Sequence, residues 1–257
     1  TVIAEWSTVI FAVCLIMREL RARDNKRADF WLGVRIFNRA ALFRMFSANV
    51  DIMIRTLLLV FSFAFFVNQS AQFGDVVLAA NHILLQIISF SAFFLDGYAF
   101  VAESLVGSSV GAKRQDIFDA TVKRSSILAL ITAAVLASWV LLFGDMGIML
   151  LTDIEEVQVT AQASLFLAAI YIFFSCAAYQ LDGIFIGASF TRQMRNAAFL
   201  SIAVYLFAWW LLAGKYGVNG LWWAMIIYVA ARADTLLLYF PALRKSIVVD
   251  SSLQAPA

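Results

Sequence analysis

Histidine, cysteine and proline are scarce in this sequence, which holds one, two and two of them in 257 residues. A single histidine argues against metal centres and against hydrolytic sites that need a nucleophile with its base. The two cysteines, Cys14 and Cys176, both lie inside apolar runs and are interpreted as small core residues, not as a disulfide. So few prolines are compatible with long uninterrupted helices.

Charged residues are also few. They make up 14% of the chain and hydrophobic residues 63%, whereas soluble domains have about 25% and about 45–50%. The mean hydropathy is +0.87. The formal net charge of +2 is too small to predict a nucleic-acid partner. This composition predicts an integral membrane protein in contact with the lipid bilayer.

Apolar residues gather in runs long enough for membrane helices, which need roughly 17–25 apolar residues each. Only helices satisfy their own backbone hydrogen bonds in lipid, so an all-α protein is expected. The first run lacks a charged start and a cleavage-type end, and therefore resembles the end of a helix more than a signal peptide. The seven runs are 1–17, 48–68, 77–106, 125–143, 158–181, 197–213 and 218–240.

Lysine and arginine alternate between the connections of these runs. Eight follow the first run, four follow the third, two the fifth and two the last, whereas the other connections hold one in all. Cytoplasmic connections carry the excess of basic residues. The pattern predicts a multi-pass protein of the plasma (inner) membrane with a cytoplasmic C-terminus, and a first run that follows further helices upstream.

The long basic connection has its own pattern. Within residues 30–46, Arg35, Arg39 and Arg44 alternate with aromatic residues. A helix of this kind lies in the membrane interface. An interfacial helix is therefore expected within a cytoplasmic linker.

Several segments together resemble the multidrug and toxic compound extrusion (MATE) transporters, most closely the DinF branch. Each segment is weak evidence alone, and their order along nearly the whole chain carries the resemblance. They are Ala79-Ala80-Asn81-His82-Ile83, Leu105-Val106-Gly107 with Gly111-Ala112, Thr152-Asp153 through Val157, Leu181 to Ala188, and Gly217 to Trp222.

The resemblance implies a fold and a function. Family members have twelve helices in two six-helix lobes, so the chain is expected to be a six-transmembrane-helix C-terminal lobe preceded by the end of helix six, without the N-terminal lobe. The implied function is multidrug efflux by ion-coupled antiport of an organic cation or amphiphile, without enzymatic activity or cofactor. The expected segments are 1–17 (end of helix six), 18–47 (linker), 48–243 (lobe) and 244–257 (cytoplasmic tail).

The coupling ion is expected to be the proton. The sodium-coupled branch has a carboxylate cation site in the middle of the lobe's first and fourth full helices, whereas residues Leu58 to Ser62 include no acid here. In DinF-like members the proton-carrying carboxylate belongs to the N-terminal lobe, so no residue of this chain inherits that role.

Asp96 is the one acid near the middle of its predicted helix. A lone charge there costs at least about 2.5–3.5 kcal/mol, so it needs a function or a polar partner. We expect it on the substrate or proton path, with a satisfied contact inside the lobe as the competing interpretation. Weaker candidates for the path are Asn49, Gln86, Tyr179 and Gln180.

Six further charges are expected to form a cytoplasmic layer of ion pairs. Arg55 is expected to meet Asp51 or Glu103, and Arg232 to meet Asp182 or another acceptor. These pairs would either hold the lobe together or belong to the cytoplasmic gate. The layer comprises Asp51, Arg55, Glu103, Asp182, Arg232 and Asp234.

Other functions remain as alternatives. A lipid-linked oligosaccharide flippase of the same superfamily would need cationic residues in its cavity, and only Arg55 and Arg232 lie within the runs. A membrane-embedded enzyme or assembly subunit would need clustered ligands. Gly107-Ser108-Ser109-Val110-Gly111 matches a nucleophile motif but lies at a helix end, where small residues more often allow close packing, as do Gly183 and Gly187.

Overall fold

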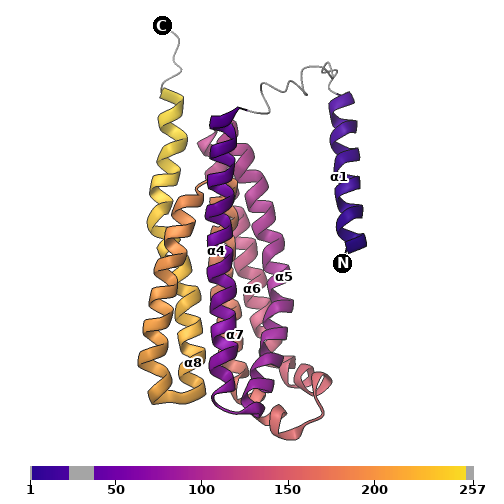
Figure 1. Cartoon of the computed structure of the whole chain (residues 1–257), viewed down its shortest axis with the longest axis vertical. Coiled ribbons are helices and arrows are strands. Elements are labelled where there is room, and N and C mark those ends of the chain that lie inside the picture. The colour runs from indigo at the N-terminus through magenta and orange to yellow at the C-terminus, as the bar shows by residue number, and fades with distance from the viewer. Residues whose placement is uncertain (1, 23–37, 253–257) are drawn as a thin grey trace. The chain divides into compact units, whose positions relative to one another are not determined.

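The computed structural model describes residues 2–22 and 38–252, all helical apart from short turns (Figure 1). The chain divides into two compact units, Thr1–Ser47 and Ala48–Ala257. The helices are α1 (Val2–Ala22), α4 (Arg39–Ala71), α5 (Asp75–Gly111), α6 (Gln115–Leu151), α7 (Glu155–Gly187) and α8 (Thr191–Ser252).

The first unit contains α1, which includes the predicted run 1–17. Residues 30–37 of the expected interfacial helix lie outside the described residues. From Arg39 onward that segment is part of α4, which runs without interruption to Ala71. The division into a linker (18–47) with an interfacial helix and a lobe (48–243) therefore stays a prediction.

Five helices of the described chain are long and apolar enough to cross a membrane, and α1 is not among them. They comprise Met45–Ala71, Asp75–Gly111, Gln115–Leu151, Glu155–Gly187 and Thr191–Ile247. By length and composition, they agree with the predicted multi-pass protein.

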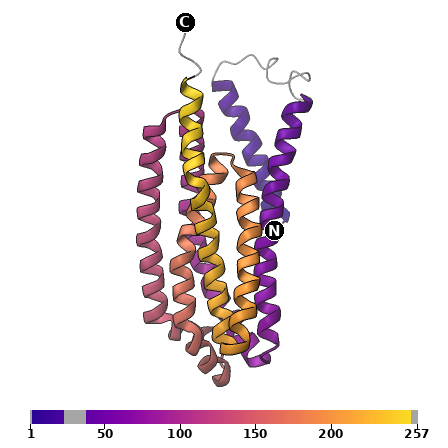
Figure 2. The same cartoon turned by 90° about the vertical axis from the view of Figure 1, so that its left-hand side faces the viewer.

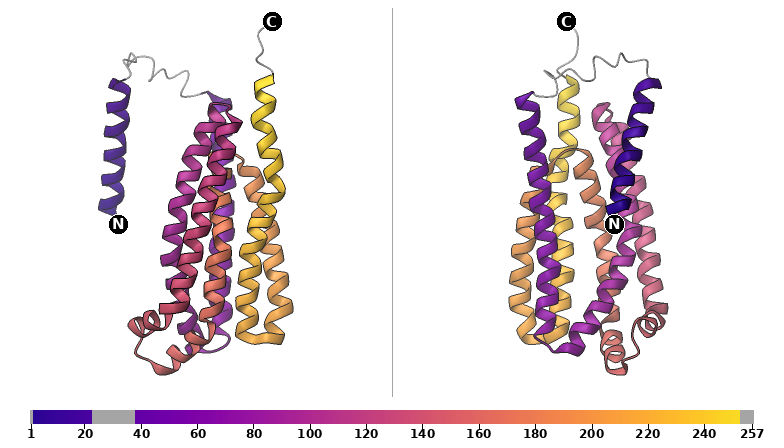
Figure 3. Two further views of the ribbon diagram at one scale, coloured as in Figure 1. Left: turned by 180° about the vertical axis from the view of Figure 1, so that it is seen from behind. Right: turned by 45° about the vertical axis from the view of Figure 1, so that its right-hand side comes forward.

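The last of these candidate spans is a helical pair. It has 57 residues, or about 85 Å of straight helix against about 30 Å of bilayer core. Gly217 interrupts it with a positive φ of 56°, which a glycine adopts without strain. A side chain at Gly220 would overlap the backbone of Leu212, because the chain folds back on itself. Figures 1 and 3 show the two parts of α8 side by side.

Helix α7 forms the centre of the second unit. It contacts α5, α6 and α8, and it is the most buried of the candidate spans. Figure 2 shows these helices running nearly parallel to one another. The core around α7 includes the fully buried residues Phe66, Phe118, Tyr171, Phe185, Tyr205 and Trp222.

Glycines let α7 approach α5 closely. A Cβ atom at Gly183 would overlap the carbonyl of Ala99, and one at Gly187 would overlap the carbonyl of Glu103. Gly107 faces Gly187, where a Cβ would lie 3.3 Å from the carbonyl oxygen. The packing interpretation of Gly183 and Gly187 is confirmed, because only hydrogen fits between the two backbones.

A buried polar chain joins three helices at the end where α4 turns into α5. Asn81 donates to the Ser70 hydroxyl at 2.8 Å, and Trp222 Nε1 donates to Asn81 Oδ1 at 3.0 Å. All three side chains are buried. Satisfied polar groups of this kind hold the register of α4, α5 and α8 in an apolar core.

Candidate functional site

A buried carboxylate joins three helices of the second unit. Asp182 of α7 accepts hydrogen bonds on its Oδ2 atom from Nη2 of Arg55 in α4 and from Nη2 of Arg232 in α8, the latter at 2.5 Å. Asp182 and Arg232 are 6% and 8% exposed, so water screens this contact little. We call Arg55, Asp182 and Arg232 the Asp182 cluster.

The charges of the Asp182 cluster do not cancel, since two guanidinium groups share one carboxylate. Asp96 of α5 lies within electrostatic reach of all three side chains and is only partly buried. With Asp96 ionised, the four side chains together are neutral. In the described structure no hydrogen bond or ion pair holds the Asp96 carboxylate, so its charge interacts at longer range.

Tyrosines surround the basic side of this site. The guanidinium carbon of Arg232 lies 5.9 Å from the ring centre of Tyr228, in a cation–π geometry. Tyr179 lies within electrostatic reach of Arg232 and Asp96, and Tyr171 within reach of Arg232. The aromatic rings of these tyrosines, together with the Asp96 carboxylate that no hydrogen bond holds in the described part of the chain, can bind a proton or an organic cation.

A second ion pair ties α4 to α8. Asp51 is 2% exposed and accepts from Arg195 Nη1 at 2.6 Å and from the Thr191 hydroxyl at 3.2 Å. Both carboxylate oxygens of Asp51 are thereby engaged by residues of α8. The partners considered for Arg55 from the sequence, Asp51 and Glu103, are not the ones it contacts, whereas Arg232 does contact Asp182.

The remaining members of the expected charge layer join neither cluster. Glu103 is partly buried and forms no ion pair in the described structure, and its backbone instead packs on Gly187. Asp234 is exposed and lines an apolar groove between the two parts of α8. Helices α4 and α8 also extend several turns beyond Arg55 and Arg232. A shared cytoplasmic depth for the six residues stays a prediction.

The other candidates for the substrate or proton path do not all lie near the Asp182 cluster. Asn49 and Gln86 are exposed, and in the part of the chain that is described no hydrogen bond joins either to the Asp182 cluster. Gln180 is buried and donates to Ser125 of α6 at 2.5 Å, while its Oε1 atom has no partner. Tyr179 alone accompanies Asp96 at the site.

Sequence reasoning missed two residues that complete the ion pairs, Thr191 and Arg195. Both lie in the first turns of α8, four residues apart, so they share one helix face. That spacing was visible in the sequence, but the carboxylate they meet is 140 residues or more away along the chain.

With this geometry in view, comparisons with known proteins identify the family. The sequence pattern of MatE matches residues 52–211. The chain belongs to the MatE family. DNA damage-inducible protein F of Escherichia coli (strain K12) is 31% identical over 92% of this chain and 50% of its own length. This agrees with the DinF-like resemblance of the sequence.

Two further comparisons extend this result. The probable multidrug resistance protein NorM of Photorhabdus laumondii subsp. laumondii is 23% identical over 93% of the MatE chain and 54% of its own length. The crystal structure of the Vibrio cholerae MATE transporter VcmN in the bent form matches with a TM-score of 0.78 at 17% identity, over 92% of this chain and 54% of that one. The MatE chain thus spans about half the length of the curated relatives it matches.

Proposed function

We propose that this chain is the C-terminal lobe of a secondary active transporter that exports organic cations or amphiphiles in exchange for protons. The observation that carries the proposal is the Asp182 cluster with Asp96 beside it. Charges inside apolar helices are costly and mark ion or substrate pathways. In an alternating-access transporter, two lobes rock about a central site and an ion gradient drives the cycle.

Asp96 is the acid of this site that can bind a proton or a cation. The Asp182 carboxylate is occupied by two guanidinium groups, and Asp51 is occupied by Arg195 and Thr191. Asp96 has no such partner in the described residues, and Tyr179 lies beside it. When a proton or a cation binds Asp96, the positive charge of the Asp182 cluster is no longer balanced. Because the cluster and Asp96 lie on α4, α5, α7 and α8, binding at Asp96 is coupled to the packing of these helices.

Proton coupling is favoured over sodium coupling by the same contacts. A sodium site needs several free oxygen ligands, and arginines engage the Oδ2 atom of Asp182 and the Oδ1 atom of Asp51. The flippase alternative would use free arginines to hold a pyrophosphate, and Arg55 and Arg232 are both held by Asp182. A multi-pass position in the plasma membrane with a cytoplasmic C-terminus completes the proposal.

The test replaces Asp96 by Asn in the complete transporter. Export of a fluorescent organic cation from energised membrane vesicles should fall at least about tenfold, because the amide keeps the shape but cannot exchange a proton. Asp145→Asn is the matched control, since Asp145 is an exposed acid of α6. Equal membrane levels of both variants establish insertion. Unchanged export by the Asp96→Asn variant at every pH would reduce Asp96 to a packing role.

A further inference from the structure

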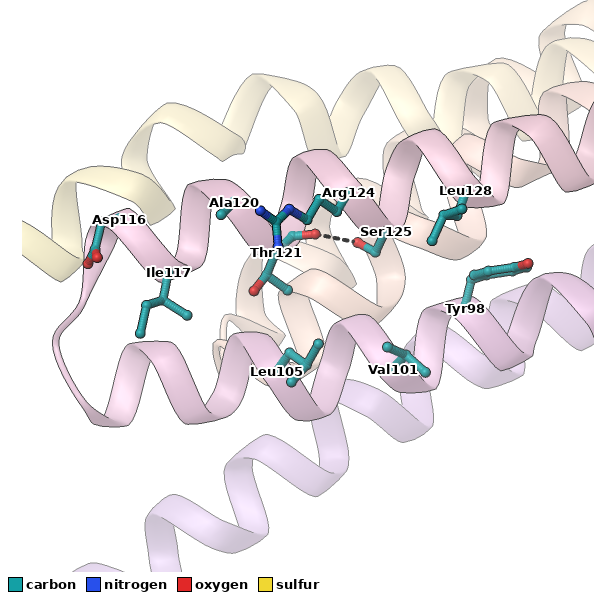
Figure 4. Close-up of a pocket in the computed structure, with 10 residues that line it drawn as sticks. All are labelled: Tyr98, Val101, Leu105, Asp116, Ile117, Ala120, Thr121, Arg124, Ser125 and Leu128. Carbon is teal, nitrogen blue, oxygen red and sulfur yellow. Dashed lines mark hydrogen bonds between the residues drawn. The ribbon is translucent and has the colours of Figure 1, made fainter.

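A groove of about 610 Å³ lies between α5 and α6, and none of its lining residues belongs to the Asp182 cluster (Figure 4). It is lined by side chains of these two helices alone. The lining residues that carry the argument are Tyr98, Val101, Leu105, Ile117, Arg124 and Leu128.

Most of the groove is apolar. Val101 and Leu105 of α5 face Ile117 and Leu128 of α6 across it. Tyr98 closes the far end, where its hydroxyl accepts a hydrogen bond from Thr132 at 2.9 Å. From Ile117 to Leu128 the groove follows about 16 Å of helix, close to half of a bilayer core of about 30 Å. Its length is therefore that of one leaflet.

The end near the α5–α6 turn is cationic. Arg124 is exposed and forms no ion pair or hydrogen bond in the described structure. In Figure 4 its guanidinium lies beside Ala120 and Thr121, on the side of the turn. Asp116 is the acid at this end, and Arg114 neutralises it through two hydrogen bonds of 2.6 and 3.2 Å. Arg124 is thus the charge left for a ligand.

We infer that this groove binds an anionic phospholipid, with its phosphate on Arg124 and one acyl chain between α5 and α6. The apolar walls belong to two candidate membrane spans, where lipid is the available partner. An arginine whose guanidinium turns towards the helix end reaches the headgroup level. By the proposed topology this is the cytoplasmic leaflet, which carries the anionic lipids. A free anion would use Arg124 but leave the apolar groove unfilled.

The experiment is a native mass spectrometry titration of the complete, purified transporter with phosphatidylglycerol, and with phosphatidylcholine of the same acyl chains. The unmodified protein should prefer phosphatidylglycerol, and Arg124→Gln should weaken that binding about fivefold. Lys123→Gln is the matched control, because Lys123 is the adjacent exposed base and does not line the groove. It should bind as the unmodified protein does.

A second variant tests the acyl chain. Ala120→Trp fills the groove and should weaken binding of both lipids, while the circular dichroism spectrum stays unchanged. Equal effects of Arg124→Gln and Lys123→Gln would overturn the site, as would competition by glycerol phosphate at the concentration of the lipid. The titration measures lipid binding and not transport. Its result can therefore be interpreted even if the export proposal fails.

Discussion

At the residue scale, Asp182 decides the electrostatics of the lobe interior. Burying an ion costs several kcal/mol, and only well-placed opposite charges offset this penalty. Asp182 receives two guanidinium groups on one oxygen, and Arg232 gains a further contact with the ring of Tyr228. Each arginine depends on this carboxylate, since the structure shows no other acid in contact with either one among the described residues.

Replacing Asp182 by Asn should destabilise the protein by about 3–5 kcal/mol, because the buried Arg232 and the partly buried Arg55 lose their counter-charge. Thermal unfolding in detergent measures the change. Asp119→Asn is the matched control, since it removes a carboxylate from an exposed pair with Arg244 and should hardly alter the melting temperature. Equal shifts for the two variants would contradict the central role of Asp182.

At the element scale, the approach of α7 to α5 sets the position of the site. Gly183 follows Asp182 directly and lies on the backbone of Ala99, three residues after Asp96. This contact fixes the level at which Asp182 and Asp96 face each other. The fold-back at Gly217 has a similar effect, because it returns α8 along the lobe and brings Arg232 to α7.

Gly183→Ala should cost about 1–3 kcal/mol of stability, because the added methyl group overlaps the α5 backbone and the helices must separate. The same measurement on Gly147→Ala serves as control. Gly147 of α6 has open space around its Cβ position, and alanine is the better helix former. Gly147→Ala should therefore be neutral or stabilising. A stable Gly183→Ala variant would mean that α5 and α7 are less closely packed than the structure describes.

At the scale of the whole molecule, the chain covers about half of its curated relatives. Expression of residues 1–257 alone should therefore give no export above background, because the gates of an alternating-access transporter lie between two lobes. Efflux of a fluorescent cation by cells that produce only this chain is the measurement. Export comparable to that of the complete transporter would refute the assignment as one lobe.

The coupling ion is also a property of the whole transporter. Export by reconstituted vesicles should persist without sodium and stop when the proton gradient is dissipated, because arginines occupy Asp51 and Asp182. A sodium gradient imposed without a proton gradient is the control. Export driven by that gradient alone would favour sodium coupling.

Much of the architecture could be predicted from the sequence. The apolar runs became long helices, and the helices around Gly217 follow the predicted division at residues 213–218. Composition alone determines whether a segment prefers lipid or water, so each run could be identified without its neighbours. The depth of the charged residues was harder to predict, because α4 and α8 extend beyond the apolar runs.

A helical, apolar protein similar to the MATE transporters could be inferred from the residues alone, because these properties depend on local composition and on the order of short segments. The ion pairs could not, because they depend on the packing of the helices. Arg55 meets Asp182 and not Asp51, since α7 brings its carboxylate to α4 while Arg195 of α8 takes Asp51. Contacts of this kind join residues 127 and 144 positions apart. Whether such residues meet depends on how the helices pack, and the spacing of residues along the chain does not give that packing.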